Sequence, residues 1–493
     1  MNVKHMILTA LLAVGFSIWL GQNVLAQTRL GLHVTKEELE IWRQRAQNGP
    51  YKTQGDVSKN SPGAWERILN KANSFRSKPS QERWKGQVQA TPITNDNDSN
   101  IPPARNLGEK LRDAAFVYLI TGETSYRDAV RNELLAQAQE PGTNWKDKKR
   151  WDPNVLTTTG RPTLDLVMWL NKLLFGYDYI RSSLKQSDRE TLDTWFLAAG
   201  LFFETQPAWV ARVRFPNRDK DDYSTPPKLG KQARVVFHGG PTVYFHHGAW
   251  GNQQAAGTRF STLVGIMLDN EFLKKSGKRW VKEAIKYAVF PEGAIGDFKR
   301  WKDDHPCLGW AYSGAVLGSI VTIADHFARD GDLELYEYET TEGLLGTKGH
   351  DQRSGKPKSL HTTIRFYLDY VDGTIKRYGT DSKSHAGKAS WQIASECPKP
   401  NSNGVWRSIR DVWSAPANIF YQDSHIKHVY MRTAPNTPPY PAKPETGGYE
   451  PWGGDQGIYP DVLFMFGQME GKVWPYPTTK VLVKSPENLR FIE

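Results

Sequence analysis

The sequence predicts a predominantly α-helical protein built from helical hairpins in series. From Leu107 onward, apolar residues recur at spacings of three and four, the period of helices that are buried on one face. Short turns such as Thr121-Gly122-Glu123 join the expected helices in pairs. The 493 residues are 39% hydrophobic and 12% aromatic, which is enough apolar material for a large core. Because no segment reads as a linker, we expect residues 27–493 to form a single domain.

The first 26 residues have the pattern of a secretory signal peptide. Lys4 precedes an apolar run from Met6 to Leu20, and Ala26 is a small residue before Gln27. We therefore expect a mature protein that starts at Gln27, has no membrane span and is periplasmic or secreted. The alternative is an uncleaved membrane anchor, against which the short run and the missing basic flank argue. The absence of a cysteine after the run argues against a lipoprotein.

Two helices are expected before the hairpins begin. Thr35 and Glu38 have the spacing of a capping box, which predicts a helix through Ala46. Ser61-Pro62 is expected to open a second helix. The polar residues 77–103, rich in Asn, Asp, Gln and Pro, then predict a loop.

The hairpins account for most of the remaining chain. Ser187 is a candidate N-cap between two of the expected helices. Serial hairpins are typical of an α-solenoid, a bundle, or a closed or open toroid, and the lack of a strict sequence period argues against the solenoid. The expected helices cover residues 107–119, 126–138, 164–184, 188–203, 262–273, 280–290, 312–329, 362–370, 408–421 and 459–466.

Residues 206–240 interrupt the helical pattern. They contain four prolines and many basic residues, with a short strand expected at 234–237. A long irregular insertion in a compact domain is usually functional or mobile. We interpret it as a cleft loop or lid, and the alternative is a plain surface loop.

The formal charge of +11 and a pI near 9.3 suggest an anionic partner. For an exported protein, an acidic polysaccharide is a more natural partner than nucleic acid. The alternative is that lysines simply solvate a helix face. The basic residues cluster in one window, which contains only three acidic residues, Glu283, Glu292 and Asp297. The basic cluster is Lys274, Lys275, Lys278, Arg279, Lys282, Lys286, Lys299, Arg300 and Lys302.

Cys307 and Cys397 are too few for a disulfide scaffold or a cysteine zinc site, and the sequence leaves their pairing open.

Six short motifs follow one another along the chain. They are Tyr-Leu-Ile-Thr-Gly-Glu-Thr-Ser-Tyr at 118–126, Gly-Tyr-Asp-Tyr-Ile at 176–180, Asn-Gln-Gln at 252–254, Glu-Gly at 292–293, Lys-Arg at 299–300 and Trp-Ala-Tyr-Ser at 310–313. In this order they resemble the alginate lyase superfamily of polysaccharide lyases. The resemblance covers residues 107–345 and implies an incomplete (α/α) toroid with long loops and minor β-structure. It also implies cleavage of a uronate polymer by β-elimination, and we expect neither a cofactor nor a metal.

The match to this superfamily is incomplete at the expected active site. In the family, an Asn-Asn-His motif opens a helix; here Asn252 matches its first residue, while Gln254 stands in place of the histidine. Arg300 and Tyr312 match the family arginine and tyrosine but lie further apart than usual. The missing imidazole has three candidate replacements, His246, His247 and His305.

The same residue types suit β-elimination on chemical grounds. The proton beside a uronate carboxylate becomes acidic only when the carboxylate is neutralised and the developing enediolate is stabilised. Asn252 and Gln254 offer amide donors, and Arg300 offers a fork-shaped cation. Tyr312 is the candidate base and acid, with His247 as a partner or alternative base.

The remaining candidates are assigned to substrate binding, and each candidate has a structural alternative. Asn252 alone predicts an N-cap, Tyr312 a core residue and Arg300 an ion pair with Asp297 or Asp303. His246 and His247 do not have the spacing of a metal motif with His238. The substrate-binding candidates are Trp250, Gln253, Lys299, Trp301, His305 and Trp310, of which the tryptophans suit either sugar stacking or the core.

Two other functions remain open from the sequence. A glycoside hydrolase on a similar toroid would need two carboxylates flanking a bond, for which Glu292, Asp297, Asp303 and Asp304 are available. A non-catalytic periplasmic glycan-binding protein would use only the aromatic and basic surface.

Overall fold

The structure is a computed structural model whose described residues carry almost all of the expected helices. They are residues 30–48, 63–85, 107–146, 161–205, 234–236, 243–245, 250–296, 308–343, 355–371, 374–375, 377–378, 392–393, 414–426, 458–467, 469 and 471–478. The expected signal peptide and most of the 206–240 insertion lie outside these ranges. No described helix is long and apolar enough to cross a membrane.

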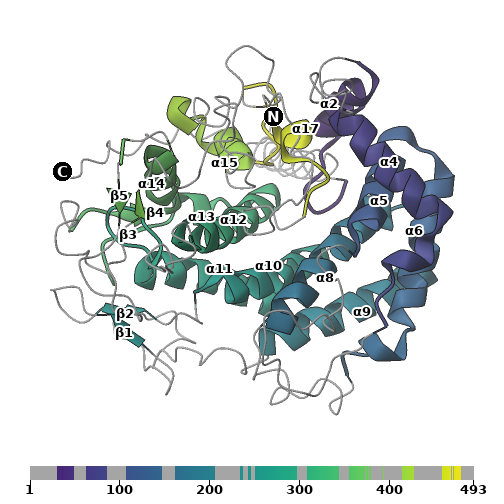
Figure 1. Ribbon diagram of the computed structural model, residues 1–493, viewed down its shortest axis with the longest axis horizontal. Helices are drawn as coiled ribbons and strands as arrows, with labels where there is room; N and C mark the ends of the chain where they lie inside the picture. The colour runs from purple at the N-terminus through teal and green to yellow at the C-terminus, as the bar shows by residue number, and fades with distance from the viewer. Residues whose placement is uncertain are drawn as a thin grey trace, which may run out of the picture.

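Helices dominate the described residues (Figure 1). They are α2 (Lys36–Gln47), α4 (Ala64–Ser77), α5 (Glu109–Thr121), α6 (Thr124–Ala138), α8 (Arg161–Arg181), α9 (Gln186–Thr205), α10 (Asn252–Met267), α11 (Glu271–Tyr287), α12 (Leu308–Arg329), α13 (Glu334–Glu337), α14 (Leu360–Val371), α15 (Ser414–Tyr421) and α17 (Val462–Phe466), with the short 3-10 helices η2 (Pro79–Glu82) and η3 (Pro141–Thr143). The predominantly helical fold class is therefore confirmed.

The β-structure is minor. Three antiparallel pairs are described, β1 (Arg234–Val236) with β2 (Val243–Phe245), β3 (Glu339–Thr340) with β4 (Lys358–Ser359), and β5 (Arg377–Tyr378) with β6 (Gln392–Ile393). The strand expected at 234–237 is confirmed as β1, and its pairing with β2 was not predicted.

Most expected helices are confirmed, with shifts at their ends. Thr35 accepts from the backbone N–H of Glu38, and the Glu38 carboxylate accepts from the backbone N–H of Thr35, so the capping box is formed as predicted. Gly63, rather than Ser61-Pro62, immediately precedes α4. The N-cap prediction for Ser187 is wrong, because α9 already starts at Gln186 and the Ser187 carbonyl accepts from Thr191 inside the helix.

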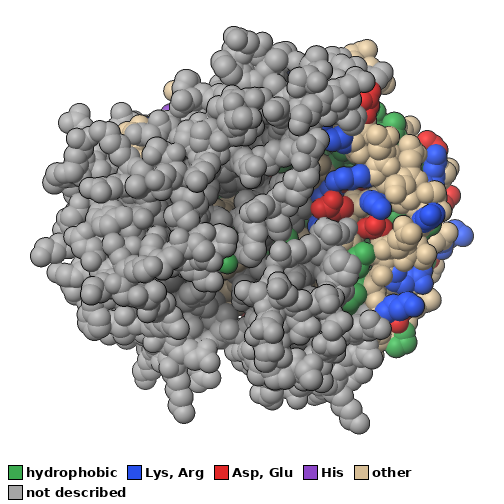
Figure 2. All heavy atoms as spheres, viewed as in Figure 1, with side chains coloured by type: hydrophobic (Ala, Val, Ile, Leu, Met, Phe, Trp, Pro, Cys, Tyr) green, Lys and Arg blue, Asp and Glu red, His purple; other side chains and the backbone are tan. Residues whose placement is uncertain are grey.

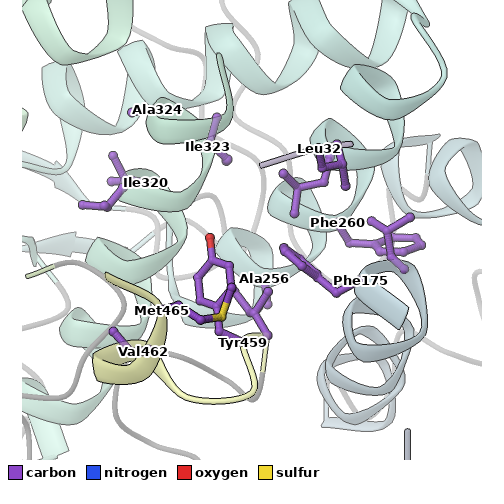
Figure 3. Packing of buried hydrophobic residues seen from close by; sticks show 14 of the residues in the cluster. Leu32, Phe175, Ala256, Phe260, Ile320, Ile323, Ala324, Tyr459, Val462 and Met465 are labelled. Atoms are coloured by element: carbon purple, nitrogen blue, oxygen red, sulfur yellow. The ribbon is translucent and has the colours of Figure 1, made fainter. Parts of the chain in front are cut away.

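The hairpins follow one another around an incomplete ring (Figure 1). Each of α5, α8, α10 and α12 packs against the next, which forms an inner row. The return helices α6, α9 and α11 lie outside it, and each packs against its own inner partner or the neighbouring one. Apolar side chains from several helices meet within the ring, including Phe175 of α8, Phe260 of α10 and Ile320 of α12 (Figure 3).

The two ends of the described chain close the gap between the first and last parts of the ring. Helices α2 and α17 lie side by side there (Figure 1). The Trp42 indole N–H donates to the carbonyl of Met465 over 2.7 Å, and the Arg45 guanidinium donates to the carbonyls of Phe464 and Gly467. At the start of the chain, Leu32 N–H donates to Asp178 of α8 over 2.9 Å. Residues far apart in sequence are thus joined by directional bonds.

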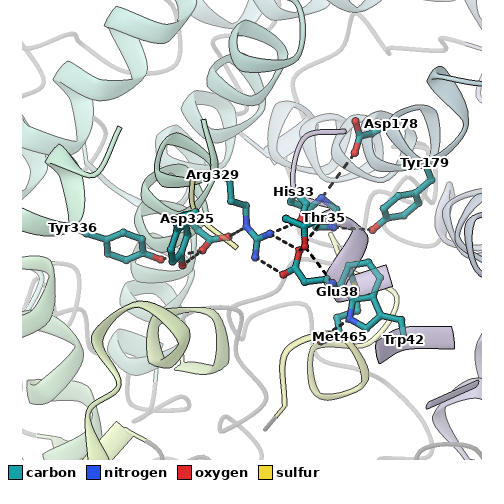
Figure 4. Close-up of polar contacts among 11 residues, drawn as sticks. His33, Thr35, Glu38, Trp42, Asp178, Tyr179, Asp325, Arg329, Tyr336 and Met465 are labelled. Carbon is teal, nitrogen blue, oxygen red and sulfur yellow. Dashed lines mark hydrogen bonds and ion pairs between the residues drawn. The ribbon is translucent and has the colours of Figure 1, made fainter. Parts of the chain in front are cut away.

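A buried ion cluster lies at this closure (Figure 4). We call Glu38, Asp325, Arg329 and Tyr476 the Arg329 cluster. Arg329 donates to both oxygens of Glu38 over 2.8 and 2.9 Å and to Asp325 over 2.7 Å. It also donates to the carbonyl of His33, and the Tyr476 hydroxyl donates to Asp325 over 2.7 Å. The cluster ties α2, α12 and the C-terminal segment together.

Candidate functional site

The candidate site is organised by the three consecutive helices α10, α11 and α12. A tight turn at residues 268–270 reverses the chain between α10 and α11, where Asn270 caps α11 by accepting from Leu273 N–H over 3.1 Å. Gly277 allows the two helices to approach closely, because a Cβ at this position would collide with Thr262. Trp250 stacks on Tyr287 at the other end of this antiparallel pair.

Helix α12 runs in the same direction as α10. Its C-terminal end lies beside the first half of α11, since Lys278 contacts the ring of Phe327 and bonds to Asp332. Helix α12 also packs extensively along α10. The N-terminal ends of α10 and α12, which carry Asn252 and Tyr312, therefore lie at the same end of the three-helix unit.

Three predicted catalytic residues are described in this unit. Asn252 is the first residue of α10 and is largely buried, at 6% exposed. Gly251 occupies the N-cap position, so the alternative that Asn252 caps the helix is wrong. Gln254 lies two residues further on in the same first turn and is half-buried, and its Nε2 donates to Thr258 Oγ1 over 3.0 Å. Tyr312 lies in the second turn of α12 and is half-buried.

Trp250 is a core residue in this structure. Its side chain is 0% exposed, and its ring stacks on Tyr287 with centroids 5.9 Å apart. A fully buried indole offers no face to a sugar, so the structure contradicts the substrate-stacking prediction for Trp250 and supports the core alternative. Its stacking packs the segment just before α10 against the last residue of α11.

The other predicted site residues remain predictions. The side chains of Gln253 and Trp310 lie outside the described structure, although both residues are in helices. Six further candidates lie wholly outside the described residues, and so do both cysteines. These candidates are Arg300, His246, His247, Lys299, Trp301 and His305.

A buried loop at residues 288–296 lies between α11 and the segment that contains Arg300. Backbone bonds close it, with Phe290 N–H donating to Ala294 O over 2.9 Å and Gly296 N–H donating to Ala288 O over 2.7 Å. Glu292 within it is only 1% exposed. This burial is unsuited to a hydrolase carboxylate that must flank a bound sugar.

The start of α14 holds this loop, which local sequence patterns did not indicate. Gly293 has φ of +103°, and a Cβ there would lie 2.6 Å from the carbonyl oxygen of Thr362. Only glycine fits such a backbone at such a close approach. Lys358, fully buried, donates from Nζ to the carbonyl of Lys286 over 2.6 Å. Lys286 lies in the last turn of α11, where carbonyls have no partner within the helix.

Opposing effects act on the pKa of Lys358. Burial is the main cause that lowers its pKa, to about 7, and the nearby Lys286 lowers it further. The carboxylates of Glu292 and Glu342 act in the opposite direction. A lysine in such surroundings changes its charge near neutral pH.

A buried histidine lies three residues after Lys358, in the first turn of α14. His361 Nε2 lies 2.9 Å from Asp423, and its ring stacks on Tyr421 with centroids 4.0 Å apart. Burial lowers the pKa of His361, although the hydrogen bond to Asp423 opposes this effect. Asp423 also accepts from Arg365 and from the backbone N–H of His425. These contacts join α14 to the turn after α15 and indicate a structural role.

The described basic residues of α11 are largely neutralised. Lys274 pairs with Asp269 over 2.6 Å and Glu271 over 2.5 Å, while Lys278 pairs with Asp332 over 2.5 Å and also with Glu334. Lys282 pairs with Glu334, and Lys286 with Glu342. These pairs favour the solvated-face alternative over a free polyanion-binding stripe on α11.

Comparisons with known proteins give one structural likeness to report. No protein-family profile and no curated protein sequence matches the chain. Among solved structures, a variant of alginate lyase A1-III complexed with a tetrasaccharide is similar at 12% sequence identity and a TM-score of 0.38. The likeness covers 62% of this chain and 76% of that one.

Proposed function

We propose that the protein is an exported polysaccharide lyase that cleaves a uronate-containing polymer, such as alginate or a glucuronan, by β-elimination. The observation that carries the proposal is the placement of Asn252, Gln254 and Tyr312 at the same end of two neighbouring helices, in the order that resembles the lyase family. The expected export signal and the basic charge of the chain agree with an anionic polymer as substrate.

The proposed mechanism divides the work between amides, a cation and a phenol. Asn252, Gln254 and Arg300 bind the uronate carboxylate and stabilise the negative charge that develops as the adjacent proton leaves. Tyr312, as phenolate, takes that proton from C5 of the sugar. The electron pair forms the C4–C5 double bond and expels the glycosidic oxygen, which receives a proton from the phenol. Atoms and charge balance without an added oxidant or cofactor.

The decisive experiment follows ultraviolet absorbance while the purified protein acts on alginate, glucuronan, hyaluronan, chondroitin, pectate and ulvan. Elimination creates an unsaturated, absorbing chain end, whereas hydrolysis creates a saturated one. We expect absorbance to rise on at least one polymer. Tyr312→Phe should then lower kcat by at least about a hundredfold, because a positioned acid or base contributes that much or more.

Tyr118→Phe is the matched control for Tyr312→Phe. Tyr118 is a half-buried tyrosine on α5, and its removal should leave the rate unchanged. Reducing ends without absorbance would identify a hydrolase. Retention of a polymer without any new ends would identify a glycan-binding protein, and either result would refute the lyase proposal.

A further inference from the structure

We propose that Lys358 is a positioning residue for the elimination reaction: its Nζ donor anchors the C-terminal end of α11 and the 288–296 loop beside the candidate site. The effect on the reaction rests on the proposed function, whereas the anchoring rests on contacts in the described structure.

The first contact is at the end of α11. The last carbonyls of a helix lack backbone partners and carry the negative end of the helix dipole, so a cation there is favourable. Lys358 Nζ donates to Lys286 O over 2.6 Å, from a strand that is 72 residues away in sequence. Its side chain is inaccessible to solvent, so it is unavailable as a substrate-binding cation.

The second contact is at the loop itself. A Cβ at Gly293 would lie 2.6 Å from Thr362 O and 2.8 Å from the Cβ of Phe366, so α14 is seated directly on the turn. Lys358 begins the segment that leads into α14, and the carboxylate of Glu292 favours its charge. The loop is therefore held directly by α14 at Gly293, while Lys358 bonds to the end of α11 two residues before the loop begins.

The position of this loop connects it to the proposed chemistry. It follows Tyr287, on which Trp250 stacks just before the start of α10, and it ends four residues before Arg300 in sequence. A displacement of about 1 Å in a residue that orients substrate can reduce a rate by about a hundredfold. Loss of the Lys358 anchor should therefore reduce catalysis without removing any group that contacts the substrate.

The anchoring is tested by hydrogen exchange, which needs no substrate. We expect Lys358→Met to increase exchange of the 288–296 amides at least about tenfold, while α5 amides stay protected as in the wild type. Lys356→Met is the matched control, because Lys356 is exposed two residues earlier, and it should change neither region. If Lys358→Met does not fold, Lys358→Gln, which keeps a donor, replaces it in the same comparison. Unchanged exchange of the loop would overturn the proposal.

The positioning role is tested by kinetics on the polymer that the wild type cleaves. We expect Lys358→Met to lower kcat about ten- to a hundredfold and to leave KM nearly unchanged. Faster loop exchange with an unchanged kcat would overturn the positioning role. A wild-type protein that forms no unsaturated ends would refute the proposed function instead, and the exchange comparison would still decide whether Lys358 anchors the loop.

Discussion

The Arg329 cluster and the lysine pairs of α11 use the same kinds of side chain in opposite surroundings. In the cluster, the side chains of Arg329 and Glu38 are 1% and 0% exposed, and directional bonds join them. By contrast, the side chains of Lys278 on α11 and its partner Glu334 on α13 are 24% and 45% exposed. The space-filling view also shows Lys and Arg side chains among Asp and Glu side chains over part of the described surface (Figure 2).

The difference shows where a charge matters for this fold. Water screens the Lys278 and Lys282 pairs of α11 and solvates each partner if the other is lost, so each of these pairs contributes little. In the Arg329 cluster, water cannot replace a lost partner, because removal of one ion leaves the other charges buried without an opposite charge. We therefore expect the closure of the ring to depend on single side chains, and the outer helix face to tolerate change.

The largest effect should come from Arg329→Met. This change leaves Glu38 and Asp325 buried without their cation, and it should lower the free energy of unfolding by about 3–5 kcal/mol. Urea denaturation of the variant and the wild type measures the loss. The double variant with Glu38→Gln should recover part of it. A loss under about 1 kcal/mol would place the Arg329 cluster in the same class as the α11 pairs.

Lys358 tests an intermediate case, a buried cation whose charge depends on pH. Its pKa falls to about 7 when folded, from an ordinary value of 10.5, so the unfolded chain binds the extra proton between these values. Lys358 therefore costs stability below pH 7, and the cost declines as the pH rises through this window. From pH 6 to 9, the wild type should gain about 1–3 kcal/mol relative to Lys358→Met. Parallel stability curves would contradict this expectation.

The capping box of α2 tests whether Thr35 helps to hold the Glu38 carboxylate in the position where it bonds to Arg329. Thr35→Ala removes the hydroxyl that bonds to Glu38 and should cost about 1 kcal/mol in the free energy of unfolding. Thr191→Ala is the control, since Thr191 is exposed within α9 and alanine suits a helix. Thermal unfolding of both variants distinguishes them, and equal melting temperatures would argue against a role for the cap.

The smallest effect should come from the outer face of α11. Lys282→Met breaks a half-exposed pair with Glu334 and should change the free energy of unfolding by less than about 1 kcal/mol. Urea denaturation at low and high salt measures both the change and its screening. An effect as large as that of Arg329→Met would remove the distinction between the two regions.

Local patterns predicted the helices well and their partners poorly. The three- and four-residue spacing located α5, α6, α8 and α9, because one apolar face must be buried whatever it packs against. The same spacing misplaced α10: the helix predicted at 262–273 runs through the turn at 268–270 into α11, whereas α10 spans Asn252–Met267. Its first turns contain small and polar residues, which carry little periodic signal.

The local charge count on α11 was incomplete for a related reason. Counted within one window, the lysines of α11 exceed the acidic residues, which suggested a binding stripe for a polyanion. Asp332, Glu334 and Glu342 lie outside that window and reach the lysines only in the folded chain. Net charge of a segment therefore predicts the folded surface only when its neighbours in space are known.

The helical class, the order of the hairpins and the capped start of α2 follow from local patterns in the chain, because these features depend on interactions between residues a few positions apart. The burial of Trp250, the bond from Lys358 to Lys286 and the contact of Arg329 with Glu38 across 291 positions of the chain follow only from the folded arrangement. Such contacts depend on how the helices are placed around the ring, and no short-range pattern records that placement.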